Sequence, residues 1–494
     1  MNLADMTFHR QWAMSIYKDQ KLMLGKMTFS KDFVAARPGP IGAPPTANRG
    51  SDGVIRNGDT YPVIALADGT EESVADGRYT VRGQATRMFC QFFPFATYAL
   101  TCHRREGSAG LVFHLPEAEA TVTLDDKALT LRCGELTESV ALPEDLDETM
   151  TMIVTCRPGH FDVYFKQNGL ARHHHTFAVD AFTLSINYKA FSHGYVAVTV
   201  DGDTSVHGLE GYIDNGISLA DLRSIRYENG EVMVEDGKVY LTASIRMHEK
   251  AFQGVFSWLP GTAELTLVGA IFYDAGDGLW CGDVAASILY HRENKRWMLW
   301  VCSFYHDHIL AHAEFDGDPR FGVNVIDITL TKPHEGEYDV TSFAGYDGDE
   351  DPDFYYDAET GKWHMAVCRV DRTPGIRGNY RYIFFESDRP FDGYTYVGQG
   401  KDGAETGGSF VHTGGKTYFV CGNGANSDYR IYSEDGMQTA KFDFPDGGYR
   451  GWGTLIPIKR GSRERYFWIT FDRHSGSHYT WSYGDVYGFE GIVE

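Results

Sequence analysis

The sequence has few features that would bind a metal, form disulfides or cross a membrane. Its 494 residues include 8 cysteines, which stand singly along the chain without a CxxC pair, so neither a zinc site nor a disulfide framework is expected. No run reaches the roughly 18 consecutive apolar residues of a transmembrane helix, and residues 1–18 contain no apolar stretch typical of a signal peptide. Because free thiols persist in reducing compartments, the sequence predicts a cytoplasmic protein.

Positive charge is also scarce. The chain has 45 Lys and Arg residues against 68 Asp and Glu residues, which gives a formal net charge of −23. A field of this sign repels the phosphate groups of nucleic acids and of anionic membranes. We therefore expect neither nucleic acid nor a membrane surface as a partner.

Helical periodicity is rare, whereas the residues of strands and turns are abundant. The chain has 55 Gly, 29 Tyr, 31 Phe and 9 Trp residues, and aromatic residues favour strands while glycine favours the turns between them. From Gly77 onward, short apolar or alternating runs are separated by Gly, Asp and Asn at roughly ten-residue intervals, a spacing typical of all-β chains. We therefore predict an all-β protein with more than one domain.

Residues 1–208 are predicted to form an accessory β-sandwich with an irregular N-terminal segment, since residues 31–60 are rich in Pro and Gly. The alternating run from Phe161 ends in an Asn-Gly turn at Gly169 and resembles the strand-turn signature of concanavalin-like and laminin-G-like jelly rolls. The cluster His173–His175 is not assigned to a metal, because three adjacent side chains cannot all face one ion. A homo-oligomer formed through this sandwich is an additional expectation.

Residues 209–494 have a different rhythm, in which one unit recurs at intervals of roughly 50 to 70 residues. Each copy has a short run opened by an acidic residue, then a turn, then an aromatic-rich strand. Four copies open at Glu228, Asp283, Asp351 and Glu405, and a fifth, which begins at Gly451, has no acid. Because each copy is long enough for four strands, we predict a five-bladed β-propeller.

The recurring acids predict a functional site on the propeller axis. The innermost strand of each blade begins beside the axis at one face, so acids that open this strand in register should converge. Two carboxylates that flank a glycosidic bond can perform acid–base hydrolysis, and a third can keep the proton donor protonated by charge repulsion.

The strands that follow the acids are expected to end at the same face and to complete a polar ring. Such a ring suits a hydroxyl-rich ligand, and a tryptophan beside it could stack on a sugar ring. The predicted substrate-binding residues are Asp283, Arg246, His306, Arg369, Asn423 and Trp452.

The order and spacing of these units resemble the five-bladed propeller glycoside hydrolases of families 43, 32, 68 and 117. Asp351-Pro352 is similar to the third-blade Asp-Pro of that superfamily, and Glu405-Thr-Gly is similar to its fourth-blade Glu-Gly-Pro, although the Pro is missing. Asp283 matches the acid of the second-blade motif. The resemblance implies that Glu405 is the general acid, that Asp351 modulates its pKa or orients the substrate, and that Asp283 contacts the sugar.

The first blade departs from the pattern, because it has no Asp-Pro where the family has its catalytic base. Glu228 opens this blade by strand register and is the predicted base or nucleophile. Asp221 and Asp214 remain alternatives for the same role.

The expected function is therefore that of a glycosidase acting on the O-glycosyl bonds of short oligosaccharides. The resemblance implies a furanoside substrate, such as arabinofuranosyl or fructofuranosyl units. No cofactor is expected, and a structural metal ion in the propeller channel, held by a histidine such as His306 or His412, is an open alternative. A non-catalytic carbohydrate-binding protein and a propeller interaction scaffold are the alternative functions.

Overall fold

The structure is a computed structural model that covers residues 1–494. The residues it describes are 3–14, 20–27, 29, 63–93, 95–157, 159–182, 194–214, 216, 218–246, 251–278, 280, 282–331, 346–371, 379–401, 403–424, 426, 428–443, 453–460, 463–471 and 486–493. The predicted irregular segment 31–60 and the predicted sugar-stacking residue Trp452 lie outside these residues.

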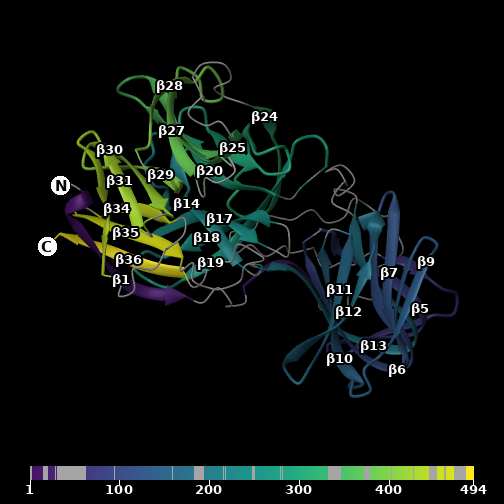
Figure 1. The fold of residues 1–494 in the computed structure, drawn as a ribbon. Coiled ribbons are helices and arrows are strands. Elements are labelled where there is room, and N and C mark those ends of the chain that lie inside the picture. Colours follow the sequence, from purple (N-terminus) through teal and green to yellow (C-terminus); the bar gives the residue numbers. More distant parts are fainter. Residues whose placement is uncertain are drawn as a thin grey trace. The chain divides into compact units, whose positions relative to one another are not determined.

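The described residues are almost entirely β-structure, which confirms the all-β prediction (Figure 1). The helices among them are two 3-10 turns, η1 (Leu3–Asp5) and η2 (Asp180–Phe182). Neither of these has the length or hydrophobicity needed to cross a membrane. The chain divides into two compact units, of which unit 1 comprises Met1–Gln20, Asn215–Ala275 and Trp280–Glu494, and unit 2 comprises Lys21–Asp214 and Gly276–Leu279.

Unit 1 has the predicted five-bladed propeller arrangement. Blade 1 contains β14 (Ser218–Ser224), β17 (Lys238–Arg246), β18 (Ala251–Trp258), β19 (Leu265–Asp274) and β23 (Gly322–Asp327), with β16 (Val234–Glu235) paired to β17. Blade 2 contains β15 (Arg226–Tyr227), β20 (Asp283–His291), β21 (Arg296–Ser303), β22 (Ile309–Phe315) and β24 (Thr329–Thr331). Blade 3 contains β25 (Tyr346–Asp357), β26 (Lys362–Asp371), β27 (Asn379–Ser387) and β28 (Thr395–Gln399).

Blade 4 contains β29 (Glu405–Thr413), β30 (Lys416–Asn423), β31 (Asp428–Ser433) and β32 (Gly436–Thr439). Blade 5 contains β34 (Thr454–Arg460), β35 (Arg463–Phe471), β36 (Val486–Val493), β1 (Met6–Met14) and β33 (Lys441–Phe442). The inner strands of successive blades contact one another in the order β14, β20, β25, β29 and β34, and β34 contacts β14 again. This closed ring of inner strands surrounds the propeller axis.

The core of unit 1 lies in layers between neighbouring blades. Blades 1 and 2 share a cluster that includes Ile271 and Trp297, and blades 2 and 3 share one that includes Trp300 and Phe385. Because both faces of a blade pack against neighbours, its strands are apolar along their whole length rather than alternating. β18, for example, is buried at every position.

The first strand of the chain belongs to the fifth blade. β1 runs antiparallel to β36, with register partners from Met6 and Val493 to Met14 and Val486, and Phe8 is buried in the cluster shared by blades 4 and 5. The predicted division into 1–208 and 209–494 differs from the structure here, since Met1–Gln20 belongs to unit 1 and unit 2 ends at Asp214. Unit 2 is thus an insertion between two strands of the propeller.

Unit 2 contains twelve strands that form one connected sheet. The strands are β2 (Lys21–Met27), β3 (Val63–Leu66), β4 (Glu71–Ala75), β5 (Arg78–Gln91), β6 (Thr97–Leu115), β7 (Ala118–Leu124), β8 (Ala128–Cys133), β9 (Leu136–Ala141), β10 (Thr149–Arg157), β11 (His160–Gln167), β12 (Leu170–Ala178) and β13 (Tyr195–Asp214). β13 runs between β5 and β6 and joins the parts of the sheet. A two-sheet sandwich stays a prediction.

A row of three glycines crosses the long strands of unit 2. Gly202 of β13 is the register partner of both Gly83 of β5 and Gly107 of β6. All three have positive φ values, of 91°, 117° and 136° respectively, and a Cβ added at Gly107 would lie 2.0 Å from the backbone oxygen of Asp201. Only glycine fits such a close approach between strands, so the row marks where three neighbouring strands bend together.

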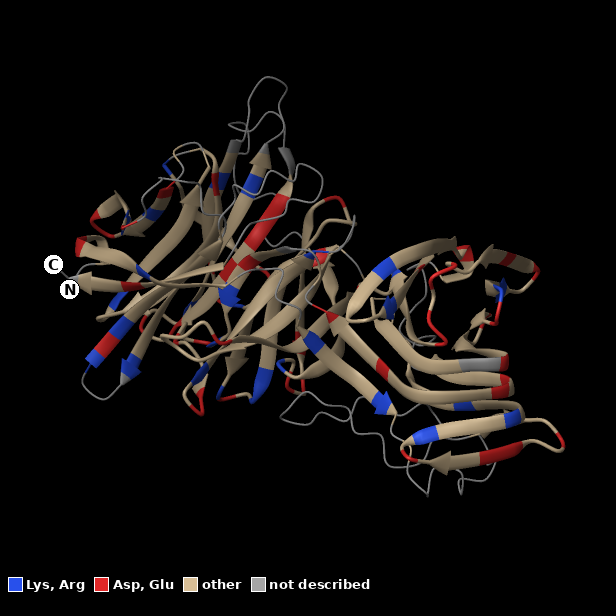
Figure 2. Cartoon of the chain, turned by 90° about the horizontal axis from the view of Figure 1, so that it is seen from below, with Lys and Arg blue, Asp and Glu red and all other residues tan. Residues whose placement is uncertain are grey.

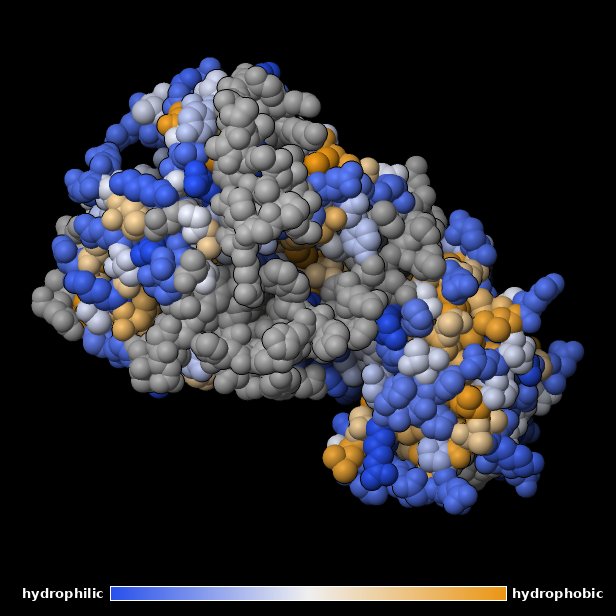
Figure 3. All heavy atoms as spheres, viewed as in Figure 1, coloured by the Kyte–Doolittle hydropathy of each residue, from blue (hydrophilic) through white to orange (hydrophobic). Residues whose placement is uncertain are grey.

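The surfaces of both units are polar, with scattered apolar groups. Figure 2 shows acidic residues at many turns and strand ends of the ribbon, and on the face seen in Figure 3 hydrophobic residues lie among hydrophilic ones. Most of the exposed large hydrophobic residues in the described part of the chain are scattered over different strands, as with Leu170 of β12 and Ile492 of β36, whereas Tyr396 and Val397 are neighbours on β28. Singly exposed apolar residues of this kind are normal for a folded protein.

Candidate active site

Four inner strands of the propeller carry a bulge at the same position. The first residue of each bulge has a left-handed backbone, with φ values of 55° at Asp221, 59° at Ala285, 48° at Asp351 and 62° at Gly407. The pairing with the second strand of the blade shifts between Ala220 and Arg223, Val284 and Ser287, Glu350 and Asp353, and Thr406 and Ser409. Such a backbone is strained for any residue except glycine, and strain of this kind concentrates at functional sites.

The bulges give the acids two different registers. Asp221 and Asp351 are the bulge residues themselves, whereas Asp283, Asp349 and Glu405 stand two positions earlier on their strands. The prediction of one shared register for the acids of blades 2, 3 and 4 therefore holds for Asp283 and Glu405 but not for Asp351. Asp349 is the residue of blade 3 that matches Asp283 and Glu405 in register.

The carboxylate of Asp351 in blade 3 forms hydrogen bonds with blade 4. Its Oδ2 accepts hydrogen bonds from Thr406 Oγ1 at 2.7 Å and from the backbone N–H of Gly407 at 2.9 Å. Asp351 is 3% exposed, so these bonds replace water around the carboxylate. Glu405 directly precedes Thr406, and the contact therefore brings the third- and fourth-blade acids into one neighbourhood.

Asp221 is the acid of the first blade in this neighbourhood. Its Oδ2 accepts a hydrogen bond from Ser244 Oγ at 2.6 Å and lies 3.9 Å from Nη2 of Arg246. Burial, and then the charge of Asp351, raise the pKa of Asp221, while Arg246, Ser244 and Arg223 act in the opposite direction. Asp351 is thus close enough to Asp221 to influence the ionisation of Asp221.

Glu405 is fully buried at the start of β29. Tyr432 of the same blade donates a hydrogen bond to its Oε1, and a Cβ added at Gly400 would lie 2.0 Å from its Oε2. Burial and the bond to Glu405 raise the pKa of Tyr432. The absence of a side chain at Gly400 therefore makes room for the carboxylate.

A further acid, Glu350, is mostly buried and directly precedes Asp351 on β25. Burial raises the pKa of Glu350, His308 lowers it, and the charges of Asp351 and Asp221 raise it further, so that it stays above its ordinary value. Nδ1 of His308 lies 3.3 Å from Oε1 of Glu350. Sequence reasoning did not select Glu350.

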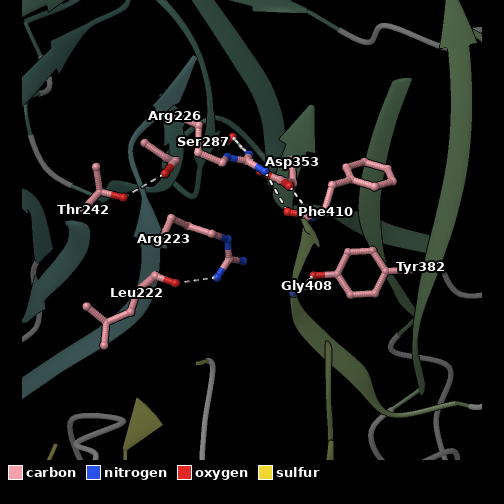
Figure 4. A network of polar contacts seen from close by, with 10 residues as sticks. Leu222, Arg223, Arg226, Thr242, Ser287, Asp353, Tyr382, Gly408 and Phe410 are labelled. Carbon is pink, nitrogen blue, oxygen red and sulfur yellow. Dashed lines mark hydrogen bonds and ion pairs between the residues drawn. The ribbon is translucent and has the colours of Figure 1, made fainter. Parts of the chain in front are cut away.

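Two positions after the bulge residues Ala285 and Asp351, Ser287 and Asp353 contribute to an axial layer (Figure 4). Asp353 accepts hydrogen bonds from Ser287 Oγ and from the backbone N–H of Phe410, both at 2.6 Å, and from Nη2 of Arg226. Arg226 also donates to the backbone oxygen of Phe410 at 2.9 Å. The fully buried Asp353 thus connects residues of blades 2, 3 and 4 with the segment that follows β14.

Glu228, the predicted base, is not in this neighbourhood. It follows β15, which pairs with Leu289 and Tyr290, near the end of β20 opposite to Asp283. Its carboxylate is bound by Arg292, with Nη2 at 2.8 Å from Oε1. The alternative Asp214 is the last residue of β13 in unit 2, so Asp221 is the first-blade acid that the structure brings near Asp351.

Three predicted substrate-binding residues lie among these acids. Asp283 is buried and opens β20, and its charge contributes to the raised pKa of Tyr273, which is due first to burial. Arg246 approaches Asp221, as described above. Arg369 is held by Asp349, with Nε at 2.6 Å from Oδ1 and Nη2 at 3.2 Å from Oδ2.

His306 and Asn423 have local partners instead. Nδ1 of His306 lies 2.6 Å from Ser303 Oγ. Asn423 is the register partner of Glu405, and its Nδ2 donates to the backbone oxygen of Gly403 at 3.2 Å. Asn423 is the last residue of β30, His306 lies in the turn that follows β21, and Trp452 lies outside the described residues.

The described residues contain no group of three or more His, Cys, Asp or Glu side chains arranged to hold a metal ion. Burial and the charge of Arg226 lower the pKa of His412 to about 4, so this ring is neutral at pH 7. Its Nδ1 lies 3.0 Å from Thr417 Oγ1. A structural metal in the propeller channel stays a prediction.

The arrangement suits proton transfer. Carboxyl groups in a low-dielectric site that repel one another do not all ionise together, so one can hold a proton while a neighbour stays charged. Glu350, whose pKa is raised, is placed to hold such a proton.

Comparison with known proteins gives structural neighbours but no family. No family model matches the chain, and no curated protein matches it. An α-L-arabinofuranosidase from Podospora anserina, solved with cellotriose, is 11% identical over 56% of this chain and 92% of its own, with a TM-score of 0.39.

Two further structures are similar to the same extent. An α-L-arabinofuranosidase from Lactobacillus brevis is 14% identical over 56% of this chain and 91% of its own, with a TM-score of 0.37. Bacillus subtilis levansucrase is 12% identical over 55% of this chain and 83% of its own, with a TM-score of 0.38. Structural neighbours of this chain thus include glycoside hydrolases, but their overlap is too loose to transfer the role of any residue.

Proposed function

We propose that the protein is a glycoside hydrolase whose acids are Asp221, Asp351 and Glu405. One observation carries the proposal: Asp221 and Asp351 occupy matching strained bulges of blades 1 and 3, and Asp351 is hydrogen-bonded to the residues that follow Glu405. Asp221 and Asp351 come from distant segments and interact with each other, and the segment that carries Glu405 binds Asp351. Burial of all three supports a role beyond solvation of a turn.

In this proposal Glu405 protonates the leaving oxygen. Asp351 orients the sugar and, by its charge, favours the protonated form of a neighbouring acid. Asp221 replaces Glu228 as the group that acts on water in an inverting reaction or attacks the sugar in a retaining one. A carboxylate separation of about 5–5.5 Å would favour retention and one of about 6.5–9.5 Å inversion.

The substrate we propose is a short oligosaccharide with a furanoside unit, a choice that rests on the resemblance of the blade motifs. The seven free cysteines of the described residues, six of them buried, support a reducing, cytoplasmic location. A homo-oligomer formed through unit 2 stays a prediction.

The test is hydrolysis of nitrophenyl pentofuranosides and fructo-oligosaccharides by the wild type and by Asp221→Asn, Asp351→Asn and Glu405→Gln. Each substitution removes a titrating carboxyl group while keeping its volume, and the expected loss in kcat/KM is at least about 100-fold. Glu228→Gln is the matched control, because Glu228 is bound by Arg292 away from the site, and it should keep wild-type activity. Full activity in Asp221→Asn, or a loss in Glu228→Gln, would contradict the assignment.

A non-catalytic carbohydrate-binding protein is the second candidate. The observation that favours it is the engagement of the Glu405 carboxylate by Tyr432, which holds the proposed proton donor in a hydrogen bond within the blade. Binding of these sugars by a wild type that hydrolyses none of them would select this function. If no sugar binds, a propeller interaction scaffold becomes the proposed function in place of the hydrolase and the carbohydrate-binding protein.

A further inference from the structure

Arg223 is a buried cation whose guanidinium is mostly unsatisfied. It stands two residues after Asp221 on β14 and is 1% exposed. Its Nη1 donates to the backbone oxygen of Leu222 at 3.1 Å, whereas its Nε and Nη2 have no hydrogen-bond partner within the described residues. Figure 4 shows the side chain extending from β14 toward Gly408 and Tyr382. An unsatisfied buried cation is expensive, so its retention requires an explanation.

Other arginines of this chain use the guanidinium nitrogens Nε and Nη2 to bind a carboxylate. Nε and Nη2 together hold a single carboxylate in several other arginine pairs, where they can donate two hydrogen bonds side by side. Examples are Arg369 with Asp349, Arg87 with Glu72, and Arg465 with Glu490. The charge of Arg223 is therefore not committed to any one acid.

Several acids nevertheless surround Arg223. Burial lowers the pKa of Arg223, but the charges of Asp351, Tyr382, Asp353 and Asp221 raise it above its ordinary value. Asp353 already has Arg226 as its direct partner. The charge of Arg223 is thus left mainly for Asp351 and Asp221, the two bulge acids.

We propose that Arg223 is a positioning residue, whose unpaired charge keeps Asp221 and Asp351 available together as carboxylates. The role of these acids in hydrolysis rests on the function proposed above. A direct ion pair between Arg223 and one of the two acids would stabilise only that carboxylate, whereas an unpaired charge near both acids stabilises both carboxylates. The other titratable or charged groups that interact with one or both of the two acids are Arg246, Glu350, Cys302, Cys368 and Tyr382.

The test compares Arg223→Met, which removes the charge but keeps a long side chain, with Arg223→Lys, which keeps the charge. The first readout is the pH dependence of kcat/KM, whose acid limb reports the essential base of the free enzyme. Arg223→Met should move this limb to higher pH by about one unit, the smaller end of the shift produced by a nearby opposite charge. Arg223→Lys should move it much less. Arg292→Met, which removes an exposed arginine bound to Glu228, is the control and should leave the limb in place.

The second readout needs no activity. All 9 tryptophans lie outside Lys21–Asp214 and Gly276–Leu279, so their fluorescence follows the unfolding of unit 1. Without the cation the folded acids bind protons up to a higher pH, so Arg223→Met should lose stability relative to the wild type as pH rises from about 4 to about 7. Arg223→Lys should follow the wild type.

The two readouts separate the inference from the proposed function. A wild type that hydrolyses no sugar would remove the proposed function, while the stability difference would still decide the role of the charge. A pH-independent stability difference in Arg223→Met, or equal effects of Met and Lys, would overturn the inference, because either result indicates packing rather than charge.

Discussion

Replacing Asp353 with asparagine should destabilise the propeller by about 3–5 kcal/mol, the range measured when one partner of a buried ion pair is removed. Asp353 is fully buried and accepts bonds from Ser287, Phe410 and Arg226. Asparagine places an N–H₂ group, which is itself a donor, where one carboxylate oxygen accepted hydrogen bonds. The substitution also leaves the positive charge of Arg226 without its partner. For a unit of this size the loss corresponds to a decrease in Tm of about 6–10 °C.

The assay is thermal unfolding followed by tryptophan fluorescence, which reports on unit 1. Asp388→Asn is the matched control, because Asp388 is exposed and its partner Lys362 is on the surface, and such pairs contribute at most about 1 kcal/mol. In a double-mutant cycle, Asp353→Asn and Arg226→Met combined should lower the stability by less than the sum of the two single losses. If Asp353→Asn melts within about 2 °C of the wild type, a shift of only about 1 kcal/mol, the view of Asp353 as the central axial contact is refuted.

Two further substitutions test other parts of the structure. Gly107→Ala should destabilise unit 2 by more than about 3 kcal/mol, because the new Cβ would lie 2.0 Å from the backbone oxygen of Asp201. The control is Gly169→Ala, which has positive φ but open space around the new Cβ and should cost only about 1 kcal/mol. Hydrogen exchange of unit 2 measures both losses of stability. Asp221→Asn should gain stability relative to the wild type as pH rises above about 4, because the raised pKa of Asp221 makes the folded wild type bind more protons than the unfolded chain in that range. Melting curves at several pH values test this sign, and a difference in Tm that does not change with pH would contradict it.

The blades could be predicted from the sequence because each repeats a local pattern. Strands such as β21, with Trp297 and Trp300, are apolar on both faces and are bounded by turns, so their type and order are visible without long-range information. The membership of β1 could not be predicted in this way. Its partner β36 lies at the other end of the chain, and no local signal connects Phe8 with that strand.

The site was only partly accessible to sequence reasoning, because a bulge changes register without changing composition. Glu228 was selected since it opens a copy of the repeat, but the position equivalent to Asp351 is Asp221. A signal was present in the similarity of Ala-Asp-Leu-Arg at Ala220 to Glu-Asp-Pro-Asp at Glu350. Arg223 lies within that motif and was missed for the same reason.

The place of unit 2 in the chain has a practical consequence. Its long segment begins at Lys21 and ends at Asp214, and these two residues are register partners on neighbouring strands, about 5 Å apart as such partners are. We expect that this segment can be excised by bridging residues 20 and 215 with a short turn, which retains every strand of the five blades. A truncation before residue 209 would instead remove β1 and open the propeller at its seam.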